Sequence, residues 1–107
     1  MGTINLSNNT ENSFFSQIAA IGSNVYVTWS DMTPGNFDTF FSASNNNGTS
    51  FGTPINLSNN TGLSANPQIE TSGNNVYVTW KDSTPGNNDI FLITNAQPFG
   101  TPVNIRQ

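Results

Sequence analysis

Hydrophobic and polar positions alternate along this 107-residue chain in short runs that Gly, Asn and Pro interrupt. In the first half, the runs rich in aromatic and β-branched side chains are residues 16–21, 24–31, 38–44 and 54–58. Successive side chains of a strand point to opposite faces, so these runs predict short, half-buried strands. No ten-residue segment has the 3.6-residue period of an amphipathic helix. We therefore expect an all-β protein of about eight or nine antiparallel strands.

The segments between these runs have the composition of tight turns. Gly22-Ser23-Asn24 and Gly73-Asn74-Asn75 are typical of hairpins, because Gly and Asn accept the positive φ that such turns require. In Thr33-Pro34-Gly35-Asn36, Pro fixes φ at the second turn position and Gly supplies the positive φ of the third, which predicts a type II turn. Consecutive strands are thus expected to pair with one another.

The whole pattern occurs twice. Residues 4–44 align with residues 55–95 without a gap, and 24 of these 41 positions are identical. The segment at 51–55 recurs at 99–103, three residues earlier than the offset of 51 requires. The chain is thus expected to form two units, 4–54 and 55–102, with a third copy of the closing strand at 103–105. Tandem four-stranded units of about 50 residues are typical of β-propeller blades.

Composition excludes several kinds of chemistry. The chain has no His, no Cys and only 7% charged residues, so it lacks an imidazole base, a thiolate nucleophile, the usual zinc ligands and disulfides. Its net charge is -4, and Lys81 and Arg106 are its only basic side chains, which excludes a surface that follows nucleic-acid phosphates. No apolar run is long enough to cross a membrane. We expect no cofactor, no nucleic acid and no membrane partner.

The segment Ser44-Asn45-Asn46-Asn47-Gly48-Thr49-Ser50-Phe51 resembles the Asp-box of sialidase-like (bacterial neuraminidase repeat) propellers, Ser-x-Asp-x-Gly-x-Thr-Trp/Phe. Here Asn46 replaces the Asp and Ser50 the Thr, and the second unit lacks the box. The resemblance implies a structural role: Ser44, Asn46, Gly48 and Ser50 close a hairpin while Phe51 packs into the blade. It does not extend to catalysis, since sialidases use an Arg cluster and a Tyr nucleophile paired with an acid. This chain has only Arg106, and Tyr26 and Tyr77 lie within strand runs.

Two acids flank the same turn in each unit: Asp31 with Asp38, and Asp82 with Asp89. Three roles fit them. Asp side chains often cap turns, carboxylates bind Ca²⁺, and paired carboxyl groups hydrolyse glycosides. Because the pair recurs identically around both turns, we favour capping, and therefore no metal site and no catalytic residue.

Aromatic residues are unevenly placed. Trp29 and Trp80 continue the alternating set of their strands, which favours core packing over sugar stacking. Phe14, Phe15 and Phe37 fall in expected loops, where the second unit has Ala65, Asn66 and Asn88. The resemblance implies that these loops share the ligand-binding face of the propeller. Three interpretations remain open: a carbohydrate or hydrophobic ligand platform, an inter-chain contact, and a small local core.

Two blades do not close a propeller, and each end blade would leave an apolar face in water at a cost of about 25 cal/mol per Å². Head-to-tail contacts that close give rings, so the expected partner is the chain itself. The resemblance to six-bladed sialidases favours a trimer, with an eight-bladed tetramer next. The expected function is a structural repeat, or a fragment excised or engineered from a larger propeller, as Met1-Gly2 before mid-repeat sequence suggests. The alternative is a glycan-binding module from an extracellular or cell-surface parent. We expect no signal peptide within this chain, and its localisation stays open.

Such a ring has one outer strand too many. Ile4-Asn5-Leu6 and Val103-Asn104-Ile105 are copies of the same closing strand and compete for the same edge of the second unit. Local closure by the C-terminal copy costs less entropy. The second unit has nevertheless lost the box that would stabilise that hairpin. We therefore expect the N-terminal copy to pair with the second unit of a neighbouring chain.

Overall fold

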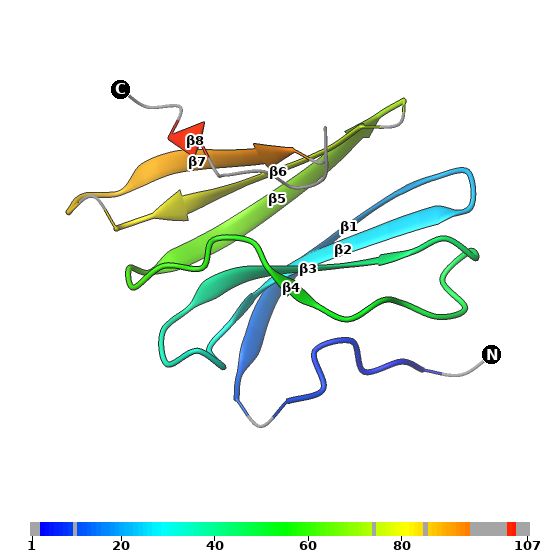
Figure 1. Ribbon diagram of the computed structural model, residues 1–107, viewed down its shortest axis with the longest axis horizontal. Helices are drawn as coiled ribbons and strands as arrows, with labels where there is room; N and C mark the ends of the chain where they lie inside the picture. Colours follow the sequence, from blue (N-terminus) through cyan, green and yellow to red (C-terminus); the bar gives the residue numbers. More distant parts are fainter. Residues whose placement is uncertain (1–2, 10, 74, 85, 95–102, 105–107) are drawn as a thin grey trace.

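Two four-stranded antiparallel sheets make up the computed structural model, which describes residues 3–9, 11–73, 75–84, 86–94 and 103–104 (Figure 1). Each sheet is a meander in chain order, and no helix occurs among the described residues. The first sheet consists of β1 (Ser13–Ile21), β2 (Asn24–Asp31), β3 (Asp38–Ser44) and β4 (Ile55–Asn56). The second consists of β5 (Ser64–Ser72), β6 (Asn75–Asp82), β7 (Asp89–Thr94) and β8 (Val103–Asn104). The all-β prediction is confirmed.

The two sheets have the same register. Ile18 pairs with Val27 in the first sheet, as Ile69 pairs with Val78 in the second. The predicted strands at 24–31 and 38–44 have the predicted bounds, whereas β4 is shorter than the predicted 54–58. β1 begins three residues before the predicted start, because the chain continues through a bulge between Phe14 and Gln17. Phe14 and Phe15 therefore lie in a strand, and their placement in a loop was wrong.

The turn after β2 closes one residue earlier than predicted. The Gly35 N–H donates to the carbonyl of Met32 (2.9 Å), so the hydrogen-bonded turn is 32–35 and not 33–36. The physical reason is Asp31, whose carboxylate accepts the Thr33 N–H and starts the turn at once. Gly35 has the positive φ that was expected, at 106°.

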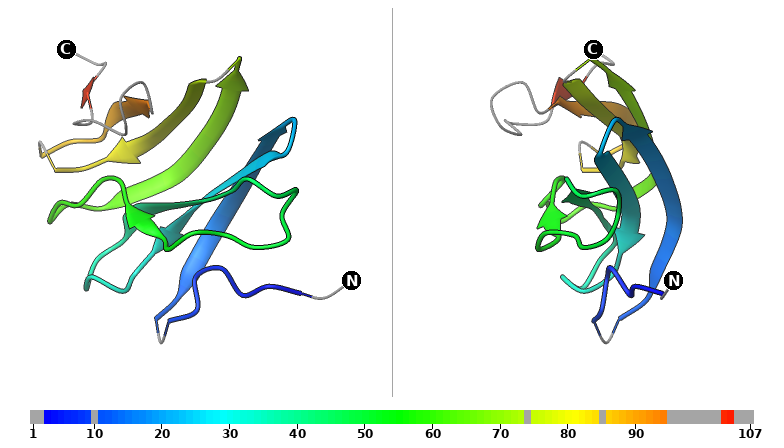
Figure 2. Two further views of the ribbon diagram at one scale, coloured as in Figure 1. Left: turned by 45° about the vertical axis from the view of Figure 1, so that its right-hand side comes forward. Right: turned by 90° about the vertical axis from the view of Figure 1, so that its right-hand side faces the viewer.

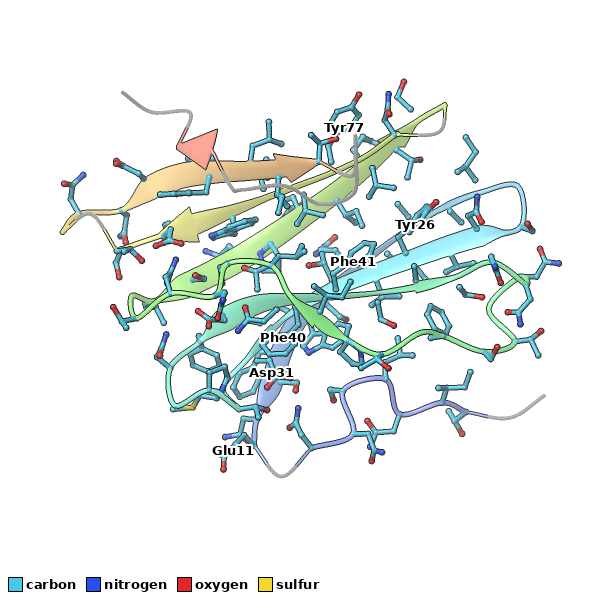
Figure 3. All side chains as sticks on the ribbon, in the orientation of Figure 1. Glu11, Tyr26, Asp31, Phe40, Phe41 and Tyr77 are labelled. Atoms are coloured by element: carbon cyan, nitrogen blue, oxygen red, sulfur yellow. The ribbon has the colours of Figure 1, made fainter. Side chains whose placement is uncertain are left out.

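The core lies between the two sheets, which pack face to face at an angle (Figure 2). Figure 3 shows Tyr26 and Phe41 on the side of the first sheet that faces the second, with Asp31 and Phe40 on its opposite side and Tyr77 on the outer side of the second sheet. The buried side chains of this core are Phe41, Leu57, Val76, Val78, Trp80 and Ile93. The first sheet contributes Phe41 to this core, with Tyr26 packed against it, and the second sheet contributes Val76, Val78, Trp80 and Ile93.

The outer edge of the second sheet is occupied by β8, in which Val103 pairs with Leu92 and Asn104 with Phe91. Residues 3–9 form no strand. Within one chain the edge is thus paired with the C-terminal copy, whereas pairing of the N-terminal copy with the second unit of a neighbouring chain stays a prediction. Local closure prevails here because a nearby segment loses less entropy on pairing than a distant one.

Candidate functional site

Asp31 and Asp82 are buried at equivalent corners of the two sheets. Asp82 accepts hydrogen bonds from Asn60 Nδ2 (2.8 Å), Ser64 Oγ (3.1 Å), Trp80 Nε1 (2.9 Å) and the Thr84 N–H (2.8 Å).

Asp31 repeats this set with the residues 51 positions earlier: Asn9 Nδ2 (2.9 Å), Ser13 Oγ (3.0 Å), Trp29 Nε1 (2.9 Å) and the Thr33 N–H (2.9 Å). Each carboxylate therefore ties the segment before the sheet, the first strand, the second strand and the turn together. Trp29 and Trp80 are buried with their indole N–H groups satisfied.

Burial is the largest single influence on the pKa of Asp82 and acts to raise it. Hydrogen bonds from Thr84, Trp80 and Asn60 outweigh burial and hold the pKa of Asp82 below its ordinary value. The same balance lowers the pKa of Asp31. Because hydrogen bonds to the charged form favour ionisation, both groups are carboxylates at neutral pH.

Asp38 has a different environment although it flanks the same turn. Burial raises its pKa above the ordinary value, which the hydrogen bonds from Asn56 and Ser58 only partly offset, and the charge of Asp82 adds to the rise. Asn56 Nδ2 donates to Asp38 Oδ2 over 2.9 Å. Its counterpart Asp89 is buried and accepts from Asn87 Nδ2 (3.2 Å).

The four aspartates thus hold their own turns and strand ends. Asp31 and Asp82 serve as acceptors for the N–H of the residue two positions on, which is the capping geometry expected from the sequence. Within the described part of the chain, no group of three or more acidic side chains is placed to hold a metal ion.

The segment that resembles an Asp-box forms a closed turn between β3 and β4. Ser44 Oγ donates to Asn46 Oδ1 (2.7 Å) and accepts from the Gly48 N–H (2.9 Å). Asn46 Nδ2 donates to Ser50 Oγ (2.8 Å), while Asn46 Oδ1 accepts the Ser50 N–H (3.0 Å). Asn46 and Ser50, the two residues that differ from the motif, are thus hydrogen-bonded to each other. Phe51 is half-buried beside this turn.

Phe14, Phe15 and Phe37 form one aromatic cluster. The ring centroids of Phe14 and Phe37 are 5.8 Å apart, and those of Phe14 and Phe15 are 5.9 Å apart. Phe15 is 63% exposed and sits at the bulge of β1 with a φ of 58°. Asn66 adopts nearly the same φ, 54°, at the equivalent bulge of β5. A Phe in this conformation is unusual, whereas Asn adopts it readily.

The first sheet has an open apolar face, a feature that sequence reasoning expected of an end blade but did not locate. Ile18 is 67% exposed, whereas the identical Ile69 is partly buried against the core between the sheets. Val25 is half-buried where Val76 is 1% exposed. Ile18 and Val25 are thus more exposed than their identical counterparts, whereas Val27 and Trp29 on the same face are buried as Val78 and Trp80 are.

A hollow of about 300 Å³ lies on this open face. It is bounded by the N-terminal segment, the start of β1 and the apolar positions of β2, namely Ile4, Asn5, Leu6, Ser7, Ser13, Phe14, Phe15, Ser16, Val27 and Trp29. The equivalent region of the second sheet is where Leu57 is buried in the core. The hollow on the first sheet is therefore equivalent to the place on the second sheet where the first sheet packs.

Polar contacts fix how the first sheet meets the segment that leads into the second. Asn36 Nδ2 donates to the carbonyls of Gly62 (2.6 Å) and Asn60 (3.3 Å), and the Ser64 N–H donates to the carbonyl of Phe37 (2.8 Å). Asn87, the counterpart of Asn36, is exposed and donates to Asp89. The second sheet thus carries the same polar group toward solvent.

Comparisons with protein-family models, with curated proteins and with solved structures find no match for this chain. The likeness to sialidase-like repeats therefore rests on the residues of the sequence. Among the residues that the structure describes there is no helix with the length and apolarity needed to cross a membrane.

Proposed function

We propose that this chain is a non-catalytic pair of propeller blades that assembles head to tail with copies of itself into a closed ring. The observation that carries the proposal is the difference between Ile18 and Ile69. The same residue, paired to the same valine position, is exposed on the first sheet and packed on the second. In the proposed assembly, the outer face of the second sheet of another copy packs on Ile18. This would repeat the contact that the first sheet makes with Ile69 within one chain.

The outer face of the second sheet has side chains that suit this role. Tyr77, Ile90 and Leu92 stand where Tyr26, Thr39 and Phe41 stand on the first sheet. Phe41 and Tyr26 pack into the core between the sheets, and their rings stack at 5.9 Å. Ile90 is 40% exposed in the single chain. This face therefore repeats the apolar character of the packed face of the first sheet at these three positions and differs from it at Lys81, which pairs with Ile90 and stands where Ser30 is buried.

A contact between two unlike faces is heterologous, and such contacts produce rings when their rotation closes. The resemblance to six-bladed propellers favours three copies, with four copies next. A non-catalytic role is supported by the composition, which lacks His and Cys, and by the hydrogen bonds that engage both Asp31 and Asp82.

Substitution of the two equivalent isoleucines tests the proposal. Ile18→Glu is expected to leave the chain folded and to abolish assembly, because it places a charge on the contact face. Ile69→Glu is the matched control and is expected to lower the melting temperature, since that side chain packs within the chain. Sedimentation velocity and circular dichroism read the two effects. Assembly that survives Ile18→Glu would contradict the proposal.

A second candidate function is carbohydrate binding by the cluster of Phe14, Phe15 and Phe37. Asn66 stays exposed although the first sheet packs beside β5, so packing between sheets does not cover the position equivalent to Phe15. Ring faces carry partial negative charge that attracts the C–H groups of a sugar. A glycan array with acidic and neutral sugars, probed with the chain and with Phe15→Ala, tests this candidate. Absence of any signal that depends on Phe15 would reject it.

A further inference from the structure

We infer that the N-terminal segment Asn5–Ser7 of one copy is the outer strand for the second sheet of the next copy, where it displaces β8. The inference rests on the proposed head-to-tail assembly and adds which strand joins the copies. In the isolated chain β8 occupies this edge through two paired residues. The question is therefore which copy of the closing strand fits the edge better.

The first sheet provides the template for this edge. Ile55 pairs with Phe41 and Asn56 with Phe40. Three further bonds continue the contact: Leu57 N–H to the Thr39 carbonyl (2.7 Å), Thr39 N–H to Ser58 Oγ (2.9 Å), and Asn56 Nδ2 to Asp38 Oδ2 (2.9 Å). A closing strand must therefore supply an apolar residue, preceded by an Asn and followed by a side-chain acceptor.

The N-terminal copy meets all three requirements. Asn5-Leu6-Ser7 is identical to Asn56-Leu57-Ser58, whereas the C-terminal copy reads Asn104-Ile105-Arg106. A guanidinium has five donors and no acceptor, so Arg106 cannot replace Ser58 as acceptor for the N–H of β7. On side-chain chemistry, the edge of the second sheet is matched by residues 5–7 and mismatched at Arg106.

The N-terminal segment already has the conformation of the template. The Asn8 N–H donates to Asn5 Oδ1 (2.9 Å) as the Asn59 N–H does to Asn56 Oδ1 (2.9 Å), and the two turn residues have φ of 39° and 43°. The Glu11 N–H donates to Asn9 Oδ1 (3.1 Å) as the Gly62 N–H does to Asn60 Oδ1 (3.1 Å).

Asn9 Nδ2 donates to Asp31 Oδ2 (2.9 Å) as Asn60 Nδ2 does to Asp82 Oδ2 (2.8 Å), so Asn9 is held relative to the first sheet as Asn60 is held relative to the second. Figure 1 shows this segment on the side of the first sheet that faces away from the second. A neighbour that packs on this side in the template geometry brings its β7 edge to Asn5–Ser7, so little ordering remains to be done on association.

Truncations and a point substitution test the inference against the assembled protein. Deletion of residues 1–7 is expected to weaken association by more than tenfold, whereas deletion of residues 101–107 leaves it unchanged or stronger. Ser7→Ala removes one acceptor and is expected to weaken association roughly fivefold. Arg106→Ser restores the acceptor to the local strand and should weaken association as well, because local closure then competes better. Sedimentation equilibrium measures each dissociation constant.

Because the chain has no Cys, pairs of introduced cysteines allow a second measurement, disulfide cross-linking, which does not depend on stability. In the template Ile55 pairs with Phe41, so Ile4→Cys with Leu92→Cys is expected to cross-link copies on oxidation, giving ladders under denaturing conditions. The control Val103→Cys with Leu92→Cys should cross-link within one chain when the protein is dilute and dissociated. Full assembly with no Ile4–Leu92 cross-link, or greater loss on deleting 101–107, would overturn the inference while leaving the ring intact. A protein that never assembles would overturn both.

Discussion

Asp82 and Asp31 each accept hydrogen bonds from four places in the chain: the segment before the sheet, the first strand, the second strand and the turn. A buried carboxylate is stable only when it is satisfied in this way. The same residues also explain why Ser13 and Ser64, which have small side chains at strand starts, are not interchangeable with apolar residues: both donate to the carboxylate.

Asp82→Asn is expected to destabilise the chain at pH 7 by about 1–3 kcal/mol, because it replaces a charged acceptor by a neutral amide. The pKa of Asp82 is lowered by folding, so its contribution is fully present above the ordinary Asp value of about 4 and is lost as pH falls through the folded value. Urea unfolding at fixed protein concentration, at pH 7 and pH 3, measures the difference. An equal loss at both pH values would contradict this account.

The contribution of Asp38 to stability has the opposite pH dependence, so Asp38 serves as the control. Its pKa is raised by burial, so its contribution is greatest below the unfolded value and declines as pH rises through the folded one. Asp38→Asn should therefore cost less at pH 7 than Asp82→Asn does.

The bulge residue Phe15 offers a test of backbone strain at a single position. Phe15→Asn and Phe15→Leu both remove an exposed ring, but only Asn adopts a φ near 58° at low cost. The Asn variant is expected to be more stable than the Leu variant by about 1 kcal/mol. Thermal melts of the two variants at one protein concentration show which is more stable. A more stable Leu variant would contradict backbone strain at residue 15.

At the scale of elements, the segment between β4 and β5 is tightly packed against the turn after β6. A Cβ added to Gly62 would lie 2.4–2.6 Å from atoms of Thr84, two of them in the backbone. The counterpart of Gly62 in the first unit is Glu11, which is exposed. The two linking segments thus share their turn hydrogen bonds but differ in how closely a neighbour approaches.

Gly62→Ala is expected to destabilise the chain by about 1–3 kcal/mol, since backbone has to move to admit the methyl group. Glu11→Ala is the matched control and should change stability by less than about 0.5 kcal/mol. Chemical denaturation of both variants measures the difference. If Gly62→Ala proves as mild as Glu11→Ala, the close approach at Thr84 is not a constraint.

Strand positions at this scale were largely predictable from sequence. The hydrophobic alternation and the turn residues placed β2 and β3 at their observed bounds. The start of β1 was missed because a bulge shifts the side-chain alternation by one residue, so Phe14 and Phe15 read as loop. The turn at 32–35 was shifted because Asp31 accepts the Thr33 N–H, a contact that depends on side-chain orientation and not on turn propensity.

The candidate site was predictable only in part. The resemblance implied that Phe14, Phe15 and Phe37 share one face, in loops; the rings do contact one another, but Phe14 and Phe15 lie in β1. Sequence did not show that Asp38 and Asp31 have pKa values displaced in opposite directions, because that depends on which groups surround each carboxylate. The open face around Ile18 also required coordinates, since Ile18 and Ile69 have identical places in the repeat.

At the scale of the whole molecule, the chain contains one contact between sheets and leaves the other face of each sheet outside that contact. The contact between the sheets buries Val76, Val78 and Trp80, whereas on the open face Ile18 is 67% exposed and Val25 is half-buried. Exposed apolar surface of this kind is costly in water and is typical of surfaces that bind a partner. In the proposed head-to-tail assembly, the second sheet of another copy would pack on this face.

The solution mass of the unaltered chain tests this account most directly. Sedimentation equilibrium over a dilution series is expected to show a discrete closed species of three copies, or next four, of the 11.5 kDa chain, without larger open polymers. The species should dissociate on dilution without intermediates dominating, because a ring gains its last contact only when complete. A folded, unaggregated 11.5 kDa monomer at every concentration up to the millimolar range would contradict the account.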